Sequence, residues 1–264
     1  MLAPSDAARL LAWYVAMGAD EAVAEVGVDR LTRAPAPSAA PPPPPATRVP
    51  PPAAAAVVTS LGTAEASARR IAAAANSLAE LAAAVAAFEG CALKRTATNT
   101  VFADGVAGAP LMIVGEAPGA DEDRLGRPFV GRSGQLLDRM LAAIGYDRRR
   151  NAYITNVLFW RPPGNRKPTP DEVAACLPFV WRHIVLAAPK VVLLCGGTAT
   201  SGLLGRGEGI MRLRGRWLEL AVAGGTPVPA LATYHPSFLL RAPARKSEAW
   251  RDLLALQSKL NDSQ

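Results

Sequence analysis

The chain has 264 residues and a formal net charge of +7 (29 basic minus 22 acidic), with a pI of about 9.8, which suits a polyanionic partner. Its three cysteines are widely spaced and odd in number, so we expect no disulfide framework. We expect the protein to lie in a reducing cytoplasm. We expect no secretory signal, because acidic and basic residues interrupt the first turn, and no apolar stretch is long enough to span a membrane.

The first 90 residues predict an extension to a globular domain. Residues 1–33 predict a helical segment, with an amphipathic helix from about Ser5 to Leu31, and residues 34–56 predict a disordered linker rich in proline and alanine. The first helix is then either a tethered element that binds an unknown protein partner or a flap that folds back. Residues 57–90 predict an alanine-rich helix on the outside of a domain that occupies residues 91–264.

Strand, loop and helix follow one another from Leu111 to Ile144. A short apolar run, LMIV, predicts a buried strand, and a loop rich in glycine, proline and acid comes after it. Ser133 is placed as the N-cap of a helix with apolar residues at helical spacing. The loop could also be a nucleotide-type phosphate loop or an ordinary βα connection. The segment has neither the dinucleotide fingerprint nor the GK[ST] of a P-loop.

The rest of the domain alternates strands with helices. This order predicts an α/β fold, a three-layer α/β/α sandwich with a short central parallel sheet of four strands. The expected strands are Leu111–Gly115, Ala152–Val157, Val191–Cys195 and Ala230–Tyr234, and the expected helices are Ser133–Ile144, Pro170–Leu186, Thr198–Leu204 and Arg245–Leu260.

Polar groups follow each predicted strand. Glu116 follows the first strand, Asn156 ends the second, a glycine pair beginning at Gly196 follows the third, and His235 follows the fourth. Carboxyl ends of parallel strands share one edge of a sheet, so we expect these groups to converge there. Each has a plain structural explanation alone, such as a cap or a packed turn, but the four together predict a site.

Three long motifs in this order resemble the uracil-DNA glycosylase superfamily, most closely the family-4 type that carries an iron-sulfur cluster. They are GEAPGADEDRLGRPFVGRSGQLLDRML (Gly115–Leu141), TNVLFWRPPGNRKPTP (Thr155–Pro170) and HPSFLLR (His235–Arg241). The likeness runs from about Cys91 to the last helix. It implies an enzyme that flips deoxyuridine out of DNA and hydrolyses its N-glycosidic bond, leaving an abasic site, in base excision repair.

The resemblance also implies roles for single residues. Phe129 would stack on the flipped base, Asn156 would bond the uracil edge, and His235 would contact uracil O2. These residue types suit the reaction, because a glycosylase must recognise the flipped base and stabilise the uracil anion as it leaves. An aromatic face contributes roughly 1–3 kcal/mol per stacked base.

The group that positions the attacking water is not fixed by the resemblance. Ala117 stands where the best-known branch has its aspartate, and Gly119 stands where that branch has a tyrosine that excludes thymine. The family-4 pattern has the acids that match Glu116 and Glu122 and the amide that matches Asn165, so the resemblance implies that these three act as a group, and we name no single general base.

The cluster cysteines are incomplete. Cys91 and Cys176 match two of the four cluster ligands, while Phe88 and Trp160 stand at the other two positions. Two thiolates cannot hold a Cys₄ cluster, so we predict no cofactor, with the two aromatic residues filling the space as an apolar plug.

Contacts with DNA are assigned to basic segments and to the last motif. The predicted DNA-binding residues are Arg214 in a loop of four arginines that also includes Arg206, then Ser237, Arg241 and the leucines Leu239 and Leu240, which resemble the wedge that fills the gap left by a flipped base. We expect a monomer, cytoplasmic and nucleoid-associated, that binds uracil-containing DNA. Two alternatives remain: a glycosylase acting on other deaminated bases, or a non-catalytic DNA-binding or polymerase-associated module.

Overall fold

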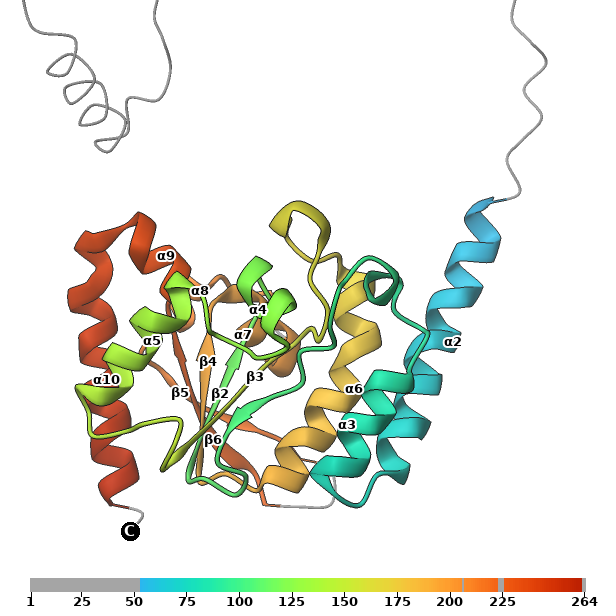
Figure 1. Ribbon diagram of the computed structural model, residues 1–264. Helices are drawn as coiled ribbons and strands as arrows, with labels where there is room; N and C mark the ends of the chain where they lie inside the picture. Colours follow the sequence, from blue (N-terminus) through green and yellow to red (C-terminus); the bar gives the residue numbers. More distant parts are fainter. Residues whose placement is uncertain (1–52, 206, 223–225, 263–264) are drawn as a thin grey trace, which may run out of the picture. The chain divides into compact units, whose positions relative to one another are not determined.

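A mixed six-stranded sheet forms the centre of the computed structural model, which describes residues 53–205, 207–222 and 226–262 (Figure 1). The strand order is β1-β3-β2-β4-β6-β5. The strands are β1 Asp104–Gly105, β2 Leu111–Gly115, β3 Ala152–Asn156, β4 Val191–Cys195, β5 Trp217–Leu220 and β6 Val228–Thr233. The four predicted parallel strands are confirmed as β2, β3, β4 and β6. The antiparallel edge strands β1 and β5 were not predicted.

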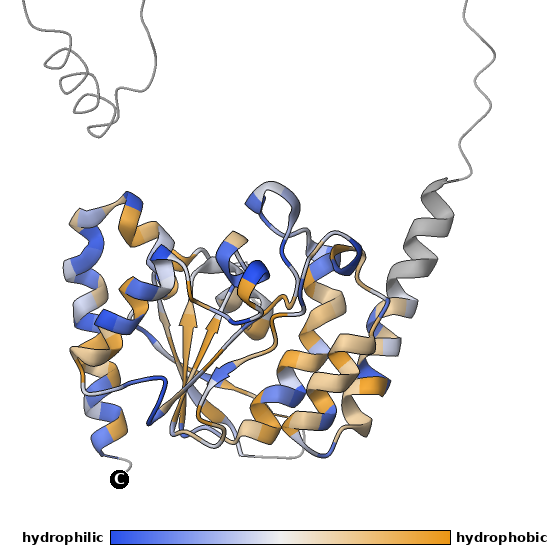
Figure 2. Cartoon of the chain, in the orientation of Figure 1, coloured by the Kyte–Doolittle hydropathy of each residue, from blue (hydrophilic) through white to orange (hydrophobic). Residues whose placement is uncertain are grey.

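Alternate residues of β2 face two different hydrophobic cores. Met112 and Val114 pack with one set of helices, and Leu111 and Ile113 pack with another. Strand side chains point to opposite faces in turn, so a strand that is buried throughout must be covered on both sides. The sheet is accordingly the middle layer of three, as predicted, and its central strands are coloured as hydrophobic in Figure 2.

The helices form the two outer layers. α5 and α10 cover one face, and α2, α3 and α6 cover the other (Figure 1). The bounds are α2 Ala53–Ala74, α3 Leu78–Ala87, α4 Ala120–Leu125, α5 Arg132–Ala142, α6 Pro170–Ala187, α7 Gly197–Leu204, α8 Ile210–Leu213, α9 Pro236–Arg241 and α10 Lys246–Asn261, with 3-10 turns at Ala92–Arg95, Pro163–Asn165 and Pro243–Arg245. None of the helices that the structure describes is long and apolar enough to cross a bilayer.

The alanine-rich segment is two helices, where one was predicted. The chain breaks at Asn76, and Ser77 caps α3 by accepting the backbone N–H of Glu80 at 3.1 Å. Glu80 in turn accepts the backbone N–H of Asn76, the residue before the N-cap, at 2.8 Å, so a second N–H at this break has a partner. Arg182 of α6 donates to the carbonyl of Ala75 at 2.8 Å, which fixes the end of α2 against α6.

Other expectations need correction or fall on residues that the structure does not describe. α5 begins at Arg132 with Gly131 as its N-cap, so Ser133 is not the capping residue. The predicted segment 1–33 and nearly all of the linker 34–56 lie outside the described residues, and the last positions of that linker, from Ala53, already belong to α2. Arg206 is also outside the described residues.

The ends of the parallel strands lie level with one another. Gly115 pairs with Asn156, and Cys195 pairs with Thr233. The residues that follow these positions therefore leave the sheet along one edge. The fold brings the predicted strand-end groups to that edge.

His183 is a buried polar group in the layer of α6. Its Nε2 lies 2.8 Å from the hydroxyl of Tyr153, its ring stacks on Phe102 at 4.4 Å, and its Nδ1 has no hydrogen-bond partner among the described residues. Burial lowers its pKa from 6.5 to about 3, because a charged ring here would lose its hydration.

We therefore expect the free energy of unfolding to fall as the solution is acidified. The unfolded chain takes up a proton on His183 below about pH 6.5, whereas the folded chain does so only near pH 3. The contribution of neutral His183 to the free energy of unfolding is therefore full above pH 6.5 and is lost as the pH falls towards 3. Between pH 7 and pH 5 the loss from this residue is about 2 kcal/mol. Urea unfolding at both pH values should show a smaller loss in His183→Gln, and an equal loss in both proteins would contradict the assignment.

Candidate active site

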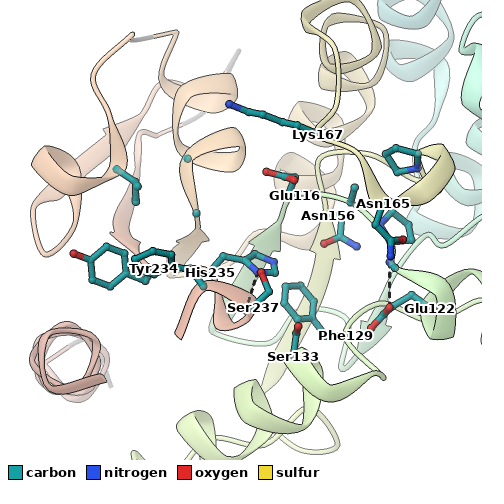
Figure 3. Close-up of a pocket in the computed structure, with 18 of the residues that line it drawn as sticks. Glu116, Glu122, Phe129, Ser133, Asn156, Asn165, Lys167, Tyr234, His235 and Ser237 are labelled. Atoms are coloured by element: carbon teal, nitrogen blue, oxygen red, sulfur yellow. Dashed lines mark hydrogen bonds between the residues drawn. The ribbon is translucent and has the colours of Figure 1, made fainter. Parts of the chain in front are cut away.

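A cavity of about 600 Å³ opens at the carboxyl edge of the parallel strands. Residues after β2, β4 and β6 and the last residue of β3 line it, and the loop before α5 closes one side (Figure 3). The structure brings together these predicted site residues: Glu116, Ala117, Gly119, Glu122, Phe129, Asn156, Asn165, Gly196, His235, Ser237 and Arg241. Arg214, Leu239 and Leu240 do not line the cavity.

Asn156 presents an unpaired acceptor in this cavity. The side chain is 1% exposed, and its Oδ1 has no hydrogen-bond partner among the described residues. A methyl group placed on Gly115 would lie 2.3 Å from that oxygen and 2.5 Å from the Phe129 ring, so the amide and the ring converge above a position where only glycine fits. A buried acceptor without a partner costs about 1–3 kcal/mol, and a ligand N–H would remove that cost.

Phe129 holds an aromatic ring against the cavity in an unusual backbone conformation. Its φ is +53°, and its ring centroid lies 5.4 Å from that of His235. The left-handed region costs a non-glycine residue about 1–2 kcal/mol, so surrounding contacts must hold it. The loop also lies directly on α5, because a methyl group at Gly134 would come within 1.8 Å of the Phe129 carbonyl oxygen.

Both carboxylate oxygens of Glu122, which was predicted to act in catalysis, are bound by backbone groups in this structure. Its Oε1 accepts the backbone N–H groups of Val130 and Gly131, both at 2.9 Å, and its Oε2 accepts that of Gly119 at 3.1 Å. With 8% exposure and both oxygens engaged, the carboxylate ties the start of α4 to the loop that carries Phe129.

Glu116 is the carboxylate left available in the cavity. One oxygen, Oε2, accepts a hydrogen bond from the hydroxyl of Thr198 at the start of α7, and the other has no hydrogen bond with the described residues. Asn165 lies on the opposite rim with a φ of +56°, where its Oδ1 accepts from Nε of Arg161 at 2.8 Å. Its amide nitrogen makes no hydrogen bond with the part of the chain that the structure describes.

The imidazole of His235 is held in one orientation by the helix that follows it. As the N-cap of α9, its Nδ1 accepts the backbone N–H of Ser237 at 3.1 Å and lies 2.8 Å from the Ser237 hydroxyl. A backbone N–H can only donate, so the ring proton must be on Nε2. Burial, and then the charge of Arg241, lower the pKa of His235 to about 4, so the ring is a neutral Nε2–H donor at pH 7.

Sequence reasoning missed several lining residues. Lys167 extends across the open side of the cavity in Figure 3, and it stands two positions after Asn165 in a motif already singled out, so that signal was available. Tyr234 could likewise have been predicted to line the cavity, because it directly precedes His235. Ile210 and Met211 come from the short helix α8, whose sequence has no feature that would have placed it beside the other motifs.

Two residues predicted to contact DNA, Arg214 and Leu239, make contacts within the protein. Arg214 forms ion pairs with Asp252 and Glu248, and its guanidinium lies 5.3 Å from the centre of the Tyr234 ring, so it is part of the packing between the sheet and α10. Leu239 is 1% exposed and packs in a small core, so it is not a free wedge. Leu240 is only partly buried and remains a candidate.

The four positions that match cluster ligands are buried in the core on one face of the sheet, and the residues present do not fit a cluster. Phe88, Cys91, Trp160 and Cys176 are all buried in the same core. Phe88 packs edge-on against Phe179 at 5.0 Å, and Trp160 donates to the hydroxyl of Thr100 at 3.0 Å. The Cys176 thiol, by hydrogen bonding, holds the pKa of Cys91 below its usual value, while the same bond and burial raise the pKa of Cys176.

Comparisons with known proteins agree with this site. The family model described as "Uracil DNA glycosylase superfamily" matches residues 102–254. A type-4 uracil-DNA glycosylase of Pyrobaculum aerophilum is 41% identical over 167 residues, which are 62% of this chain and 84% of that protein. One of Thermotoga maritima is 43% identical over 152 residues, 57% of this chain and 77% of that protein. A DNA polymerase of Bacillus phage SP01 is 30% identical over 152 residues, 58% of this chain but 16% of the polymerase.

The matched segment covers more than half of the chain and contains the cavity from Glu116 to Arg241. The chain belongs to the uracil-DNA glycosylase superfamily.

Proposed function

We propose that this protein is a uracil-DNA glycosylase, which flips deoxyuridine out of DNA and hydrolyses its N-glycosidic bond, leaving an abasic site for base excision repair. The observation that carries the proposal is the unpaired Oδ1 of Asn156, buried beside the Phe129 ring above Gly115. A planar base with an N–H on its edge satisfies both groups at once. The named activity of the type-4 relatives supports the same conclusion.

Recognition of uracil follows from the amide of Asn156. Its Oδ1 would accept N3–H of uracil, and its amide nitrogen would donate to O4. Cytosine offers the reverse pair on the same edge, so an Oδ1 directed at its N3 would face another acceptor. The Phe129 ring would contribute stacking, which does not depend on which base is bound.

Bond cleavage requires charge stabilisation on both sides of the glycosidic bond. Uracil leaves as an anion, and the neutral Nε2–H of His235 would donate to O2 as negative charge grows there. The sugar becomes cationic at the same time, and the available oxygen of Glu116 would favour that charge and orient the attacking water. Asn165 on the opposite rim would help to hold that water.

Binding of DNA is assigned to the mouth of the cavity. Ser237 and Arg241 of α9 line it on one side and Lys167 lies on another, so cationic groups would contact the phosphates on either side of a flipped nucleotide. The protein would act as a monomer on single- or double-stranded uracil-DNA in the cytoplasm. The match to part of a DNA polymerase favours, as a second candidate, a non-catalytic module associated with replication.

A cleavage assay separates these candidates. Labelled oligonucleotides with U opposite G, U opposite A, single-stranded U, T opposite G and hypoxanthine are incubated without metal and then treated with alkali. We expect product at uracil only, with the rate reduced about 10²–10³-fold in His235→Ala, since an oxyanion donor is lost. Ser201→Ala, exposed on α7, is the control and should match the wild-type rate. Cleavage at hypoxanthine alone would mean that the enzyme acts on another deaminated base. Salt-sensitive DNA binding without any cleavage would support the non-catalytic DNA-binding module.

The tautomer and charge of His235 can be tested directly. Because its pKa is about 4, below the usual 6.5, the ring stays neutral from pH 8 down to about pH 5. The plot of single-turnover rate against pH should have the same shape near pH 6.5 in the wild type and in His235→Ala, because His235 does not titrate there. Nitrogen NMR of the two histidines should show the proton of His235 on Nε2. A proton on Nδ1, or titration near pH 6.5, would refute the assigned role.

We also propose that the protein holds no iron-sulfur cluster. Only two thiols occupy the four ligand positions, and no third metal-binding side chain joins them among the described residues. Protein purified anaerobically should lack a brown absorbance band and stoichiometric iron and sulfide. It should also keep its melting temperature when incubated with a chelator. Iron in stoichiometric amount would overturn this proposal and leave the glycosylase proposal intact.

A further inference from the structure

We propose that Arg148 is a positioning residue that holds Phe129 in place to stack on the base, an inference that rests on the proposed glycosylase function. Arg148 follows α5 in a turn, 19 residues after Phe129. Its Nη2 donates to the carbonyl oxygen of Phe129 at 2.7 Å, and its Nη1 donates to that of Pro128 at 3.1 Å. Two consecutive carbonyls of the loop are therefore held by one guanidinium.

The guanidinium is itself fixed by two carboxylates. Its Nε donates to Asp138 of α5 at 2.8 Å, and its Nη1 donates to Asp104 of β1 at 3.0 Å. The side chain of Arg148 is 13% exposed, so these ion pairs are shielded from solvent on the Arg148 side. A planar group with five donors can bind two carbonyls and two carboxylates in one fixed orientation, which a lysine ammonium cannot do.

The backbone N–H groups of the same loop are bound by a second side chain, Glu122. Glu122 accepts the N–H groups of Val130 and Gly131, directly after the carbonyls that Arg148 binds. The two side chains together fix the peptide groups on both sides of Phe129, the residue with the positive φ. Contacts of this kind are what a strained conformation requires in order to persist.

Arg148 acts from outside the base cavity. It lines a separate hollow of about 430 Å³ on the far side of the loop, and Phe129 lines both this hollow and the base cavity. The guanidinium is not among the groups lining the base cavity, so its effect on the reaction passes through Phe129. Loss of this support leaves the ring present but poorly placed, and a displacement of this kind lowers a rate by up to about a hundredfold.

A double-mutant cycle on the full chain tests this dependence. The proteins are wild type, Arg148→Lys, Phe129→Leu and the double variant, with Arg149→Lys as a control, because the neighbouring Arg149 is exposed and its side chain makes no hydrogen bond or ion pair within the described residues. Single-turnover rates on U:G DNA should fall about tenfold to a hundredfold in Arg148→Lys and stay unchanged in Arg149→Lys. The double variant should be no slower than Phe129→Leu, since Arg148 has no stacking ring left to position.

A fluorine NMR measurement reads the same ring without relying on activity. The chain has six phenylalanines, and full replacement by 4-fluorophenylalanine gives a spectrum in which Phe129→Leu identifies the Phe129 signal. Arg148→Lys should shift or broaden this signal and leave the other five in place, while Arg149→Lys should leave all six in place. Melting temperatures show whether each variant is folded, and Arg148→Met replaces Arg148→Lys if the lysine variant is not.

The outcomes distinguish this inference from the proposed function. A wild-type protein that cleaves no uracil-DNA refutes the glycosylase proposal, and the fluorine spectrum then decides whether Arg148 positions Phe129. An active wild type with Arg148→Lys equally active, or with rate losses that multiply in the double variant, overturns the positioning role. A general loss of structure would move all six fluorine signals and would also overturn it.

Discussion

The parallel register of β2, β3, β4 and β6 is the constraint on which the site depends. Because paired strands end level with one another, the first residue beyond each strand is delivered to the same edge of the sheet. Four short chain segments, far apart in sequence, thereby place a carboxylate, an amide, a glycine turn and an imidazole around one cavity. The two helical layers matter to the site mainly because they bury both faces of these strands and so prevent the register from slipping.

Much of this arrangement could be predicted from the sequence, because strand ends are easy to locate. An apolar run followed by a polar residue places Glu116, Asn156 and His235 at the sheet edge without any knowledge of the helices. The edge strands β1 and β5 could not be predicted, since one has two residues and the other alternates exposed and buried positions weakly. The break between α2 and α3 was hidden because alanine continues on both sides of Ser77.

The roles of charged residues were harder to predict, because charge alone does not say which partner a side chain meets. Glu122 and Arg214 were both expected to face substrate or DNA. The first is bound by three backbone N–H groups, and the second is paired with acids of α10. Arg148 belongs to no motif, and its partners lie up to 44 residues away, so only the folded structure could reveal its contacts. Such long-range polar contacts are where sequence patterns carry least information.

The hydrogen bond between Nδ1 of His235 and the N–H of Ser237 makes the imidazole part of α9. The same helix carries Arg241 at its other end, on the rim of the cavity. The six residues of α9 thus join the side chain proposed to contact a phosphate to the imidazole proposed to donate to the leaving base. In the proposed complex, a DNA backbone that displaces α9 would also displace the donor at uracil O2, so backbone binding and bond cleavage would depend on the position of one helix.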